Sequence, residues 1–462
     1  MIKLEQIELA DFGQASALPQ IATDEYESRL AAVVERMKEH RLNFLAVYGD
    51  REHFANMAYL TGFDPRFEEA LLLLDCQGRR LLLVGNEGHG YVDQDGPPLE
   101  VELFQDFSLL GQPRDSSRPL RTILSGFGIG RTAKVGCVGW KYFVGNDVEG
   151  GREAMEIPSY LVDLLRDLTA DRSAVTNATH LFMDPRDGLR VTNTAAQIAQ
   201  FEYAATRVSQ SVRSVIRHLR EGVSERELAR YLQDDGLPRS CHAMLSFGDK
   251  VKRGLSSPSD NVARRGDQFT VAFGLWGALT CRAGAIAAGP EDLPPQSRDF
   301  YANLASNYFD VVACWYERVA VGAAAGEVVT AVDDRRDKTL FEFAVNPGHS
   351  IHLDEWVHSA FVPAGKISLR SGMALQMDII PVSKGPFWYV NAEDGIALAD
   401  QKLRAQIAAQ YPQCWQRMTA RRAFMRDILG IRIDDTVLLL SNTPGVLAPY
   451  ALRGDYVFVQ AS

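Results

Sequence analysis

The chain has 462 residues, 46% of them hydrophobic and 23% charged, as expected for a globular protein with a large core. Its 49 basic and 59 acidic side chains leave a net charge of -10, which disfavours nucleic acid or an anionic membrane as a partner. We find no apolar targeting segment at the start of the chain and no apolar run long enough to span a bilayer. The six cysteines are scattered without a CxxC pair. We therefore expect a reduced, cytoplasmic protein without a structural zinc site.

The first part of the chain has the pattern of a small α/β domain. An amphipathic helix begins near residue 24 and leads into an apolar strand at 43–49. Two further strands are predicted within 68–85, joined by a turn at 75–78, and another at 132–140. We assign residues 1–180 to this domain.

The second part begins after a polar, turn-rich segment at 183–193. A long helix is predicted from residue 194 to Gly222, and Ser224 with Glu227 forms a capping-box pattern at the next helix. Another helix is expected at about 297–320. The remaining apolar runs are strand-like and are separated by turns; they cover 268–277, 278–289, 373–382 and 387–400. We assign 181–462 to a second domain, so the whole chain is expected to be α/β (α+β).

Six stretches in this order resemble the creatinase and aminopeptidase P family. They are "MAYLTGFDPRFEEALLLL" (57–74), "GVSERELARYL" (222–232), "RRGDQFTVAFG" (264–274), "NPGHSIHLDEW" (346–356), "SGMALQMDIIP" (371–381) and "VNAEDG" (390–395). The resemblance covers about residues 25 to 400. It implies a small creatinase-like N-terminal domain followed by a C-terminal "pita-bread" catalytic domain.

The metallopeptidases of that family hold two divalent ions with two aspartates, one histidine and two glutamates. Carried over position by position, the histidine is His349, one glutamate is Glu393, and the other is replaced by the shorter Asp378. The first aspartate falls at Ala272 and the second near Cys281 or Arg282, where no carboxylate stands. The resemblance therefore predicts a site that has lost the ligands of a second ion.

Creatinase is the metal-free precedent in this family, with a histidine general base and glutamates. Its histidine would fall within "KRGLSSPSDN" (252–261), which contains none. The chain thus departs both from the two-metal site of the peptidases and from the metal-free site of creatinase, and three hypotheses stay open. His349, Asp378 and Glu393 form a metal-free acid/base site, or hold a single divalent metal, or belong to a catalytically reduced, ligand-binding relative. We expect no cofactor and keep the single metal as the alternative.

The histidine-rich segment supplies the candidate catalytic residues. His349 follows Gly348 as the family's pocket histidine does, and we predict that it transfers protons, with Asp378 and Glu393 as an acid/base pair. If the segment is extended, His352 and Asp354 share the opposite face and His352 acts behind His349. Asp354 and Glu355 are either site carboxylates or solvated loop residues.

Four further residues are candidates for substrate binding. His358 is expected at the rim of the pocket, and His242 is expected to replace the missing histidine from a neighbouring strand. Arg282 would pair with Asp378 or Glu393, or bind a substrate carboxylate in bidentate fashion. Arg66 would hold the substrate carboxylate, or is alternatively a surface partner of Glu68 or Glu69. Cys281 is read as a buried thiol rather than a nucleophile.

These assignments predict a creatinase-like hydrolase that cleaves a C–N bond, of amide or amidine type, in a small carboxylate-bearing amino-acid derivative. A mononuclear metal-dependent peptidase or a lyase on the same fold are the alternatives. The resemblance also implies a homodimer in which the N-terminal domain of one subunit overhangs the partner's pocket, and small molecules rather than nucleic acid or membrane as ligands.

Overall fold

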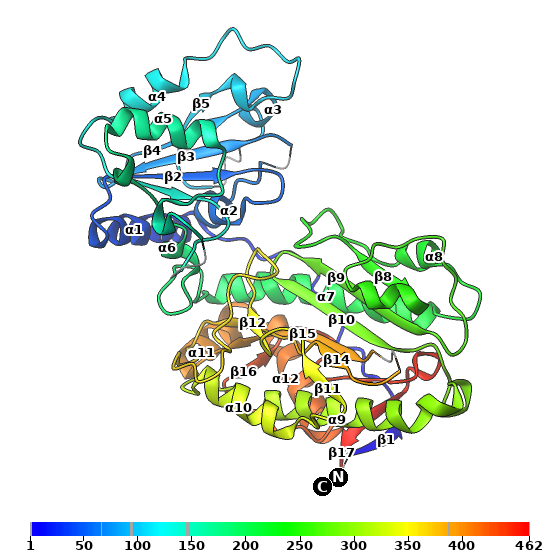
Figure 1. Cartoon of the computed structure of the whole chain (residues 1–462). Helices are drawn as coiled ribbons and strands as arrows, with labels where there is room; N and C mark the ends of the chain where they lie inside the picture. The colour runs from blue at the N-terminus through cyan, green and yellow to red at the C-terminus, as the bar shows by residue number, and fades with distance from the viewer. Residues whose placement is uncertain (1, 66, 93–95, 145–147, 387–388, 462) are drawn as a thin grey trace. The chain divides into compact units, whose positions relative to one another are not determined.

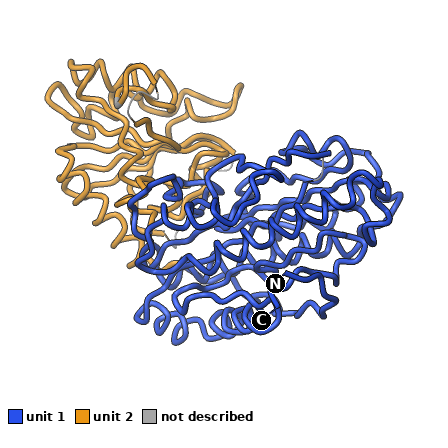
Figure 2. Tube along the Cα trace, turned by 60° about the horizontal axis from the view of Figure 1, so that its bottom comes forward, with its two compact units in different colours: residues 1–20, 192–462 blue, residues 21–191 orange. Residues whose placement is uncertain are grey.

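The computed structural model describes residues 2–65, 67–92, 96–144, 148–386 and 389–461. The chain divides into two compact units, which are coloured separately in Figure 2. Unit 2 is Ile21–Val191, and unit 1 combines Met1–Gln20 with Thr192–Ser462. The boundary therefore lies eleven residues after the predicted position at 180, and the first twenty residues do not belong to the N-terminal domain.

Two hydrogen bonds explain the later boundary. The hydroxyl of Tyr59 donates to the carbonyl of Leu189 at 3.0 Å, and the Arg190 guanidinium donates to Asn56 at 2.8 Å. Both Asn56 and Arg190 are buried, so the segment up to Val191 is anchored in unit 2.

Unit 2 has the α/β pattern expected from the sequence (Figure 1). Its helices are α1 (Thr23–Glu39), α2 (Ala55–Thr61), α3 (Asn86–His89), α4 (Leu120–Phe127), α5 (Ser159–Thr169) and α6 (His180–Met183), and its strands are β2 (Phe44–Gly49), β3 (Ala70–Asp75), β4 (Arg80–Val84), β5 (Glu100–Leu103), β6 (Val135–Val138) and β7 (Val175–Asn177). Among the described residues these strands form one sheet in the order β5-β4-β3-β2-β6-β7.

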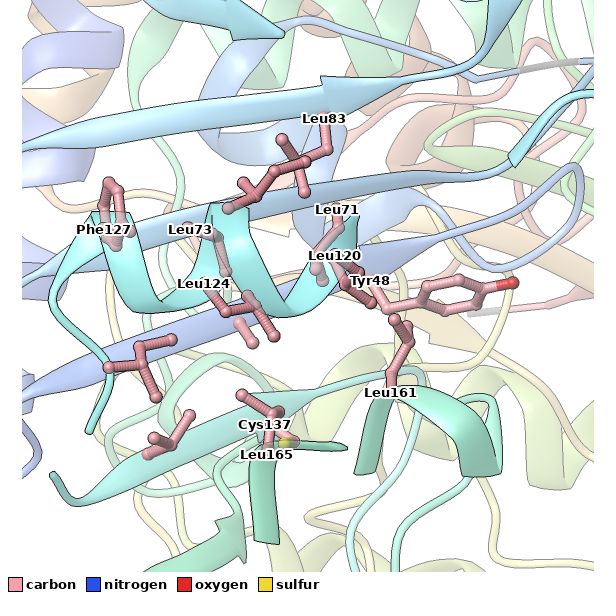
Figure 3. Packing of buried hydrophobic residues seen from close by; sticks show 14 of the residues in the cluster. Tyr48, Leu71, Leu73, Leu83, Leu120, Leu124, Phe127, Cys137, Leu161 and Leu165 are labelled. Atoms are coloured by element: carbon pink, nitrogen blue, oxygen red, sulfur yellow. The ribbon is translucent and has the colours of Figure 1, made fainter. Parts of the chain in front are cut away.

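The core of unit 2 lies between this sheet and two helices (Figure 3). Leu71 and Leu73, two positions apart on β3, share one face of the sheet. Leu124 of α4 and Leu165 of α5 belong to the same buried cluster. The apolar side chains that alternate along the strands and those that recur along α4 and α5 thus pack together in one cluster.

Unit 1 contains the elements of the second predicted domain and a C-terminal helical pair. Its helices are α7 (Ala195–His218), α8 (Glu225–Ala229), α9 (Arg298–Arg318), α10 (Ala325–Arg335), α11 (Gln401–Gln410) and α12 (Pro412–Asp427), and its strands are β1 (Ile2–Gln6), β8 (Met244–Phe247), β9 (Gln268–Leu275), β10 (Ala278–Ala285), β11 (Phe341–Phe343), β12 (His349–Ser350), β13 (Ala374–Met377), β14 (Pro381–Ser383), β15 (Asn391–Leu398), β16 (Val437–Leu439) and β17 (Tyr456–Gln460).

The large sheet of unit 1 positions the candidate residues. Its described strands run β12-β13-β15-β10-β9-β8, all neighbours antiparallel, and β16 pairs with β15. Helix α7 packs on β9 and β10 (Figure 1). The predicted capping box is present: the Ser224 hydroxyl accepts from the Glu227 amide at 3.2 Å, and the Glu227 carboxylate accepts from the Ser224 amide at 2.8 Å.

Two smaller pairings complete unit 1. Strand β11 pairs with β14, and β1 pairs with β17, which joins the two ends of the chain. No helix in the described part of the chain is both long and apolar enough to cross a bilayer.

Candidate acid/base site

The register of the large sheet gathers one row of side chains on a single face. Residues directly opposite each other in antiparallel strands point to the same side. Cys281 of β10 lies opposite Ala272 of β9 and opposite Glu393 of β15. Of the two positions at which the family resemblance places the missing aspartates, Cys281 therefore adjoins Glu393, and Ala272 follows one strand further along the same face. A thiol and a methyl group stand in their place.

The same face continues across the next two strands. Gln376 of β13 lies opposite Gly395, two residues after Glu393, and also opposite His349 of β12. Asp378 follows Gln376 by two positions and lies just beyond the end of β13. His349, Asp378 and Glu393 converge as the sequence predicts: each offers one nitrogen or oxygen, and these atoms all lie within 4.8 Å of one another. All three side chains are buried.

Glu355 is the residue that the predicted catalytic set lacks. Its Oε1 lies 3.2 Å from Nε2 of His349, closer than Oδ2 of Asp378 at 3.8 Å. Nδ1 of His349 lies 3.2 Å from the carbonyl oxygen of Ser350. The indole of Trp356 stacks on the imidazole, with ring centroids 4.1 Å apart and planes 19° apart. His349 is thus enclosed by its own loop.

The loop fold explains why Glu355 reaches His349. The alternation considered for this segment requires an extended backbone, but Ser350 and His358 form an antiparallel bridge, and the Ser350 amide donates to the His358 carbonyl at 2.8 Å. The Val357 amide donates back to the Ser350 carbonyl at 3.0 Å. The chain between them must turn, so the strand-like alternation assumed for His349, His352 and Asp354 does not apply.

Burial dominates the electrostatics of the two carboxyl groups. It raises the pKa of Asp378 to about 7, against the attraction of His349, and the charge of Glu355 raises it further. Burial also raises the pKa of Glu393 well above its usual range, and the nearby charges of Asp378 and Glu355 add to the effect. Asp378 is therefore near its midpoint at neutral pH, and Glu393 holds its proton more tightly than an exposed glutamate does.

His349 is shifted toward its charged form. Burial by itself lowers the pKa of this imidazole, but the contact with Glu355 and the charge of Asp378 outweigh burial, so the pKa lies above its ordinary value. The carboxyl groups around His349 therefore favour its protonated form.

Two buried acceptor atoms of this site have no hydrogen bond to the described residues. The Gln376 amide nitrogen donates to Oε1 of Glu393 at 3.2 Å and to the Leu279 carbonyl at 2.8 Å. Oε1 of Gln376 and Oδ1 of Asp378 are buried and have no hydrogen-bond partner among the described residues. Such buried acceptors favour a bound water or a substrate N–H group.

The other two histidines of the segment are buried outside this group. His352 packs edge-on against Phe201 of α7, with centroids 5.2 Å apart. His358 is buried where its backbone closes the loop. The proposed catalytic support by His352 and rim position of His358 remain predictions.

Arg282 does not bind a substrate carboxylate from this face, contrary to the prediction. It neighbours Cys281 on β10, so its side chain points to the opposite side of the sheet. There it is buried and donates to Asp394 at 2.6 Å and to the carbonyl of Glu393 at 3.1 Å, and it also contacts the Thr443 carbonyl. The arginine neutralises Asp394 and fixes β15.

His242 and Arg66 also fall outside the converging group. His242 is exposed, and its Nε2 lies 2.8 Å from the carbonyl oxygen of Leu255, so it does not replace the missing histidine. It precedes β8 in a loop rather than lying in the strand. Arg66 lies outside the described residues, and its predicted role is not addressed by the structure.

Cys281 is buried as expected. Burial, followed by the charge of Glu393, raises the pKa of its thiol well above the ordinary value. Asn391 donates to the sulfur at 3.4 Å. A protonated, hydrogen-bonded thiol beside Glu393 is a space-filling group, not a nucleophile.

Solved structures with the same architecture are prolidases and related peptidases. A prolidase from Pyrococcus horikoshii OT3 aligns with a TM-score of 0.61 at 15% identity, covering 80% of this chain and 95% of that one. An Xaa-Pro dipeptidase from Bacillus anthracis aligns at 0.59 and 15%, covering 82% and 96%. An X-Pro aminopeptidase from Thermotoga maritima aligns at 0.61 and 14%, covering 80% and 95%. No protein-family model and no curated protein matches the sequence.

The chain has the pita-bread fold of the creatinase and aminopeptidase P family. Within that fold, the face does not fit two metal ions, because Ala272 has no ligand atom and neither missing aspartate is replaced by a carboxylate. The donor set of His349, Asp378 and Glu393 does fit one divalent ion.

Proposed function

We propose that this pita-bread protein is a hydrolase that cleaves an amide- or amidine-type C–N bond in a small carboxylate-bearing amino-acid derivative, using a metal-independent acid/base site. The observation that carries the proposal is the convergence of His349, Asp378 and Glu393 within 4.8 Å on one sheet face. Two buried carboxyl groups of different proton affinity provide both an acid and a base at one pH.

The roles follow from the proton occupancy of each group. Asp378 accepts a proton from water as the water oxygen bonds to the substrate carbon. Glu393, whose pKa burial raises, gives its proton to the nitrogen as the C–N bond breaks. The proton on Asp378 then returns to Glu393 through His349 or solvent, which restores the site. His349, held by Glu355, stabilises the carboxylate of Asp378 during the transfer.

The chemistry of the lining favours a nitrogen-bearing group. Glu355, Asp378, Glu393 and Gln376 all present oxygen atoms to this space. Amide N–H groups and amidinium groups donate hydrogen bonds to such acceptors. A C–N bond is therefore the bond that the site holds best.

A single divalent ion is the second candidate, and the same three donor atoms support it. His349, Asp378 and Glu393 would hold such an ion, which would supply Lewis-acid polarisation of the scissile group. Elemental analysis of the purified protein separates the candidates. Metal well below one equivalent, with activity retained in chelator, supports the metal-independent site, whereas stoichiometric metal that activity requires supports the alternative.

The central test is the turnover of a His349→Ala variant on substrates found in a screen of small amides and amidines. We expect turnover to fall by about 10²- to 10⁴-fold, the usual range for a group that takes part in proton transfer, because the variant lacks the imidazole that stabilises the Asp378 carboxylate and relays its proton. The melting temperature and circular dichroism spectrum should remain those of a folded protein.

Two companion variants sharpen this test. Glu355→Gln, which keeps the shape of the side chain, should lower turnover less than His349→Ala and should lower the pKa of His349, measured by nuclear magnetic resonance. His352→Ala should cost less than either, since His352 packs against Phe201. Near-normal turnover in His349→Ala, or a loss confined to His352→Ala, would refute the assignment.

A further inference from the structure

One pocket in unit 1 is lined by cations. It has a volume of about 610 Å³, and Arg226, Arg230, Arg239 and His242 are its ionisable lining residues. None of its described lining residues is acidic. This basic pocket contrasts with the net charge of -10 of the whole chain and with the oxygen-rich acid/base site.

The arginines of the basic pocket keep donors available. Arg226 uses Nε to bind Asp260 at 2.8 Å, and the Asp260 side chain is 86% exposed. Arg239 binds Asp234 at 2.9 Å near the surface. Such exposed pairs are weak. Arg230 forms no ion pair with the described residues. The guanidinium groups of the pocket therefore have N–H donors that can bind an entering anion.

The loop at 239–242 connects this pocket to the acid/base site. Cys241 packs against Gly274 of β9, where its Sγ would lie 3.0 Å from a Cβ placed on that glycine. Gly274 is two residues after Ala272, so it lies on the face that carries Glu393. Burial, followed by the charges of Glu355 and Glu393, raises the pKa of the Cys241 thiol.

The basic pocket and the sheet face of the acid/base site therefore share one loop. Arg239 and His242 line the pocket and stand two residues and one residue from Cys241, which packs on that face, and consecutive Cα atoms are about 3.8 Å apart. The pocket thus offers an anion-binding surface on a loop that borders the face carrying Glu393. Arginine is suited to this task because its planar fork matches a carboxylate.

We propose that the basic pocket, through Arg230 and Arg239, binds the carboxylate of the substrate whose C–N bond is cleaved at His349, Asp378 and Glu393. The proposal rests on the proposed function and gives the carboxylate a binding site that Arg282 does not provide. The acid/base site then binds the nitrogen-bearing end of the substrate, and the basic pocket binds its anionic end.

The experiment measures binding without turnover. 4-Oxopentanoate has the shape of N-acetylglycine with a CH₂ in place of the amide N–H, so it cannot be hydrolysed at that bond. Its affinity and that of its neutral carboxamide are measured by calorimetry on the wild-type chain and on Arg230→Ala and Arg239→Ala. Arg217→Ala, an exposed arginine of α7 outside the pocket, is the matched control.

We expect each pocket variant to bind 4-oxopentanoate about tenfold more weakly, as for the loss of a hydrogen bond to a charged group. Arg217→Ala should bind normally, the carboxamide should bind weakly and equally to all proteins, and added salt should weaken only the carboxylate. The proposal is overturned if carboxylate binding is undetectable or unaffected by both variants. If the arginine dependence holds while no amide or amidine is hydrolysed, the proposed reaction fails and the anion pocket stands.

Discussion

Asp378 owes its proton affinity to burial on a sheet face, and this has a consequence for stability. A carboxyl group whose pKa is raised from about 4 in the unfolded chain to about 7 in the folded one binds more protons when folded. Folding is therefore favoured by this group below about pH 4, and that contribution is lost as the pH rises toward 7. The full shift corresponds to about 4 kcal/mol.

We predict that Asp378→Asn stabilises the chelator-treated protein at pH 8 but not at pH 4. The amide has the same shape as the protonated acid and cannot ionise, so it removes the cost of a buried charge. Urea unfolding of both proteins at several pH values measures the difference. An asparagine variant that loses stability relative to the wild type as the pH rises would contradict the pKa of about 7.

At the scale of single residues, the sequence predicted which residues form the site better than it predicted where their side chains point. His349, Asp378 and Glu393 could be matched to motifs, and the structure brings them together. The roles of Arg282 and Glu355 could not be predicted, because both depend on which way a side chain points. Arg282 is one register position from the site and faces away. Glu355 reaches His349 only because a non-local bridge closes its loop.

At the scale of elements, one buried ion cluster joins two helices that lie far apart in the sequence. Glu202 of α7 accepts from Arg417 of α12 at 2.6 and 2.8 Å and from Arg421 at 2.7 Å. The side chains of Glu202 and Arg421 are fully buried. The family resemblance covers the chain only to about residue 400, and α12 lies beyond it. The sequence therefore did not indicate that α12 packs against α7.

We predict that Glu202→Gln lowers the free energy of unfolding by about 3–5 kcal/mol, since it leaves Arg421 as an uncompensated buried charge. Asp435→Asn is the control, because Asp435 pairs with Arg422 of the same helix at 2.7 Å but is 81% exposed. That change should cost no more than about 1 kcal/mol. Equal effects of the two substitutions in denaturant unfolding would show that the buried cluster contributes no more than a surface pair.

At the scale of the molecule, the homodimer remains a prediction. Phe67 and Leu110 of unit 2 are 56% and 97% exposed and line one pocket of about 660 Å³. Exposed apolar side chains that gather in this way are typical of interfaces. We expect a dimer by sedimentation velocity and a shift toward monomer in Leu110→Asp. Leu255→Asp, at an exposed leucine of unit 1, should leave the dimer intact; a monomeric wild type would disprove the assembly.

The N-terminal segment is the largest departure from the predicted organisation. Its strand β1 pairs with β17 over 450 residues away, a contact that no local pattern specifies. Beyond β1, Arg213 of α7 donates to the carbonyls of Leu9 and Ala10, both at 2.7 Å, and Asn442 donates to the Gly13 carbonyl at 2.8 Å. These donors hold the backbone of the segment on unit 1.

We predict that deletion of residues 2–20 destabilises unit 1 selectively. Losing one strand and at least three hydrogen bonds, at about 1 kcal/mol each, should lower the unfolding temperature of unit 1 by about 10 °C. Hydrogen exchange followed by mass spectrometry measures both units in one experiment. Amides of β17 and α7 should exchange faster, and those of the β2–β4 strands of unit 2 should not. Deletion of residues 2–6 removes only β1 and should give a smaller effect, whereas faster exchange throughout unit 2 would show that the segment supports the N-terminal domain after all.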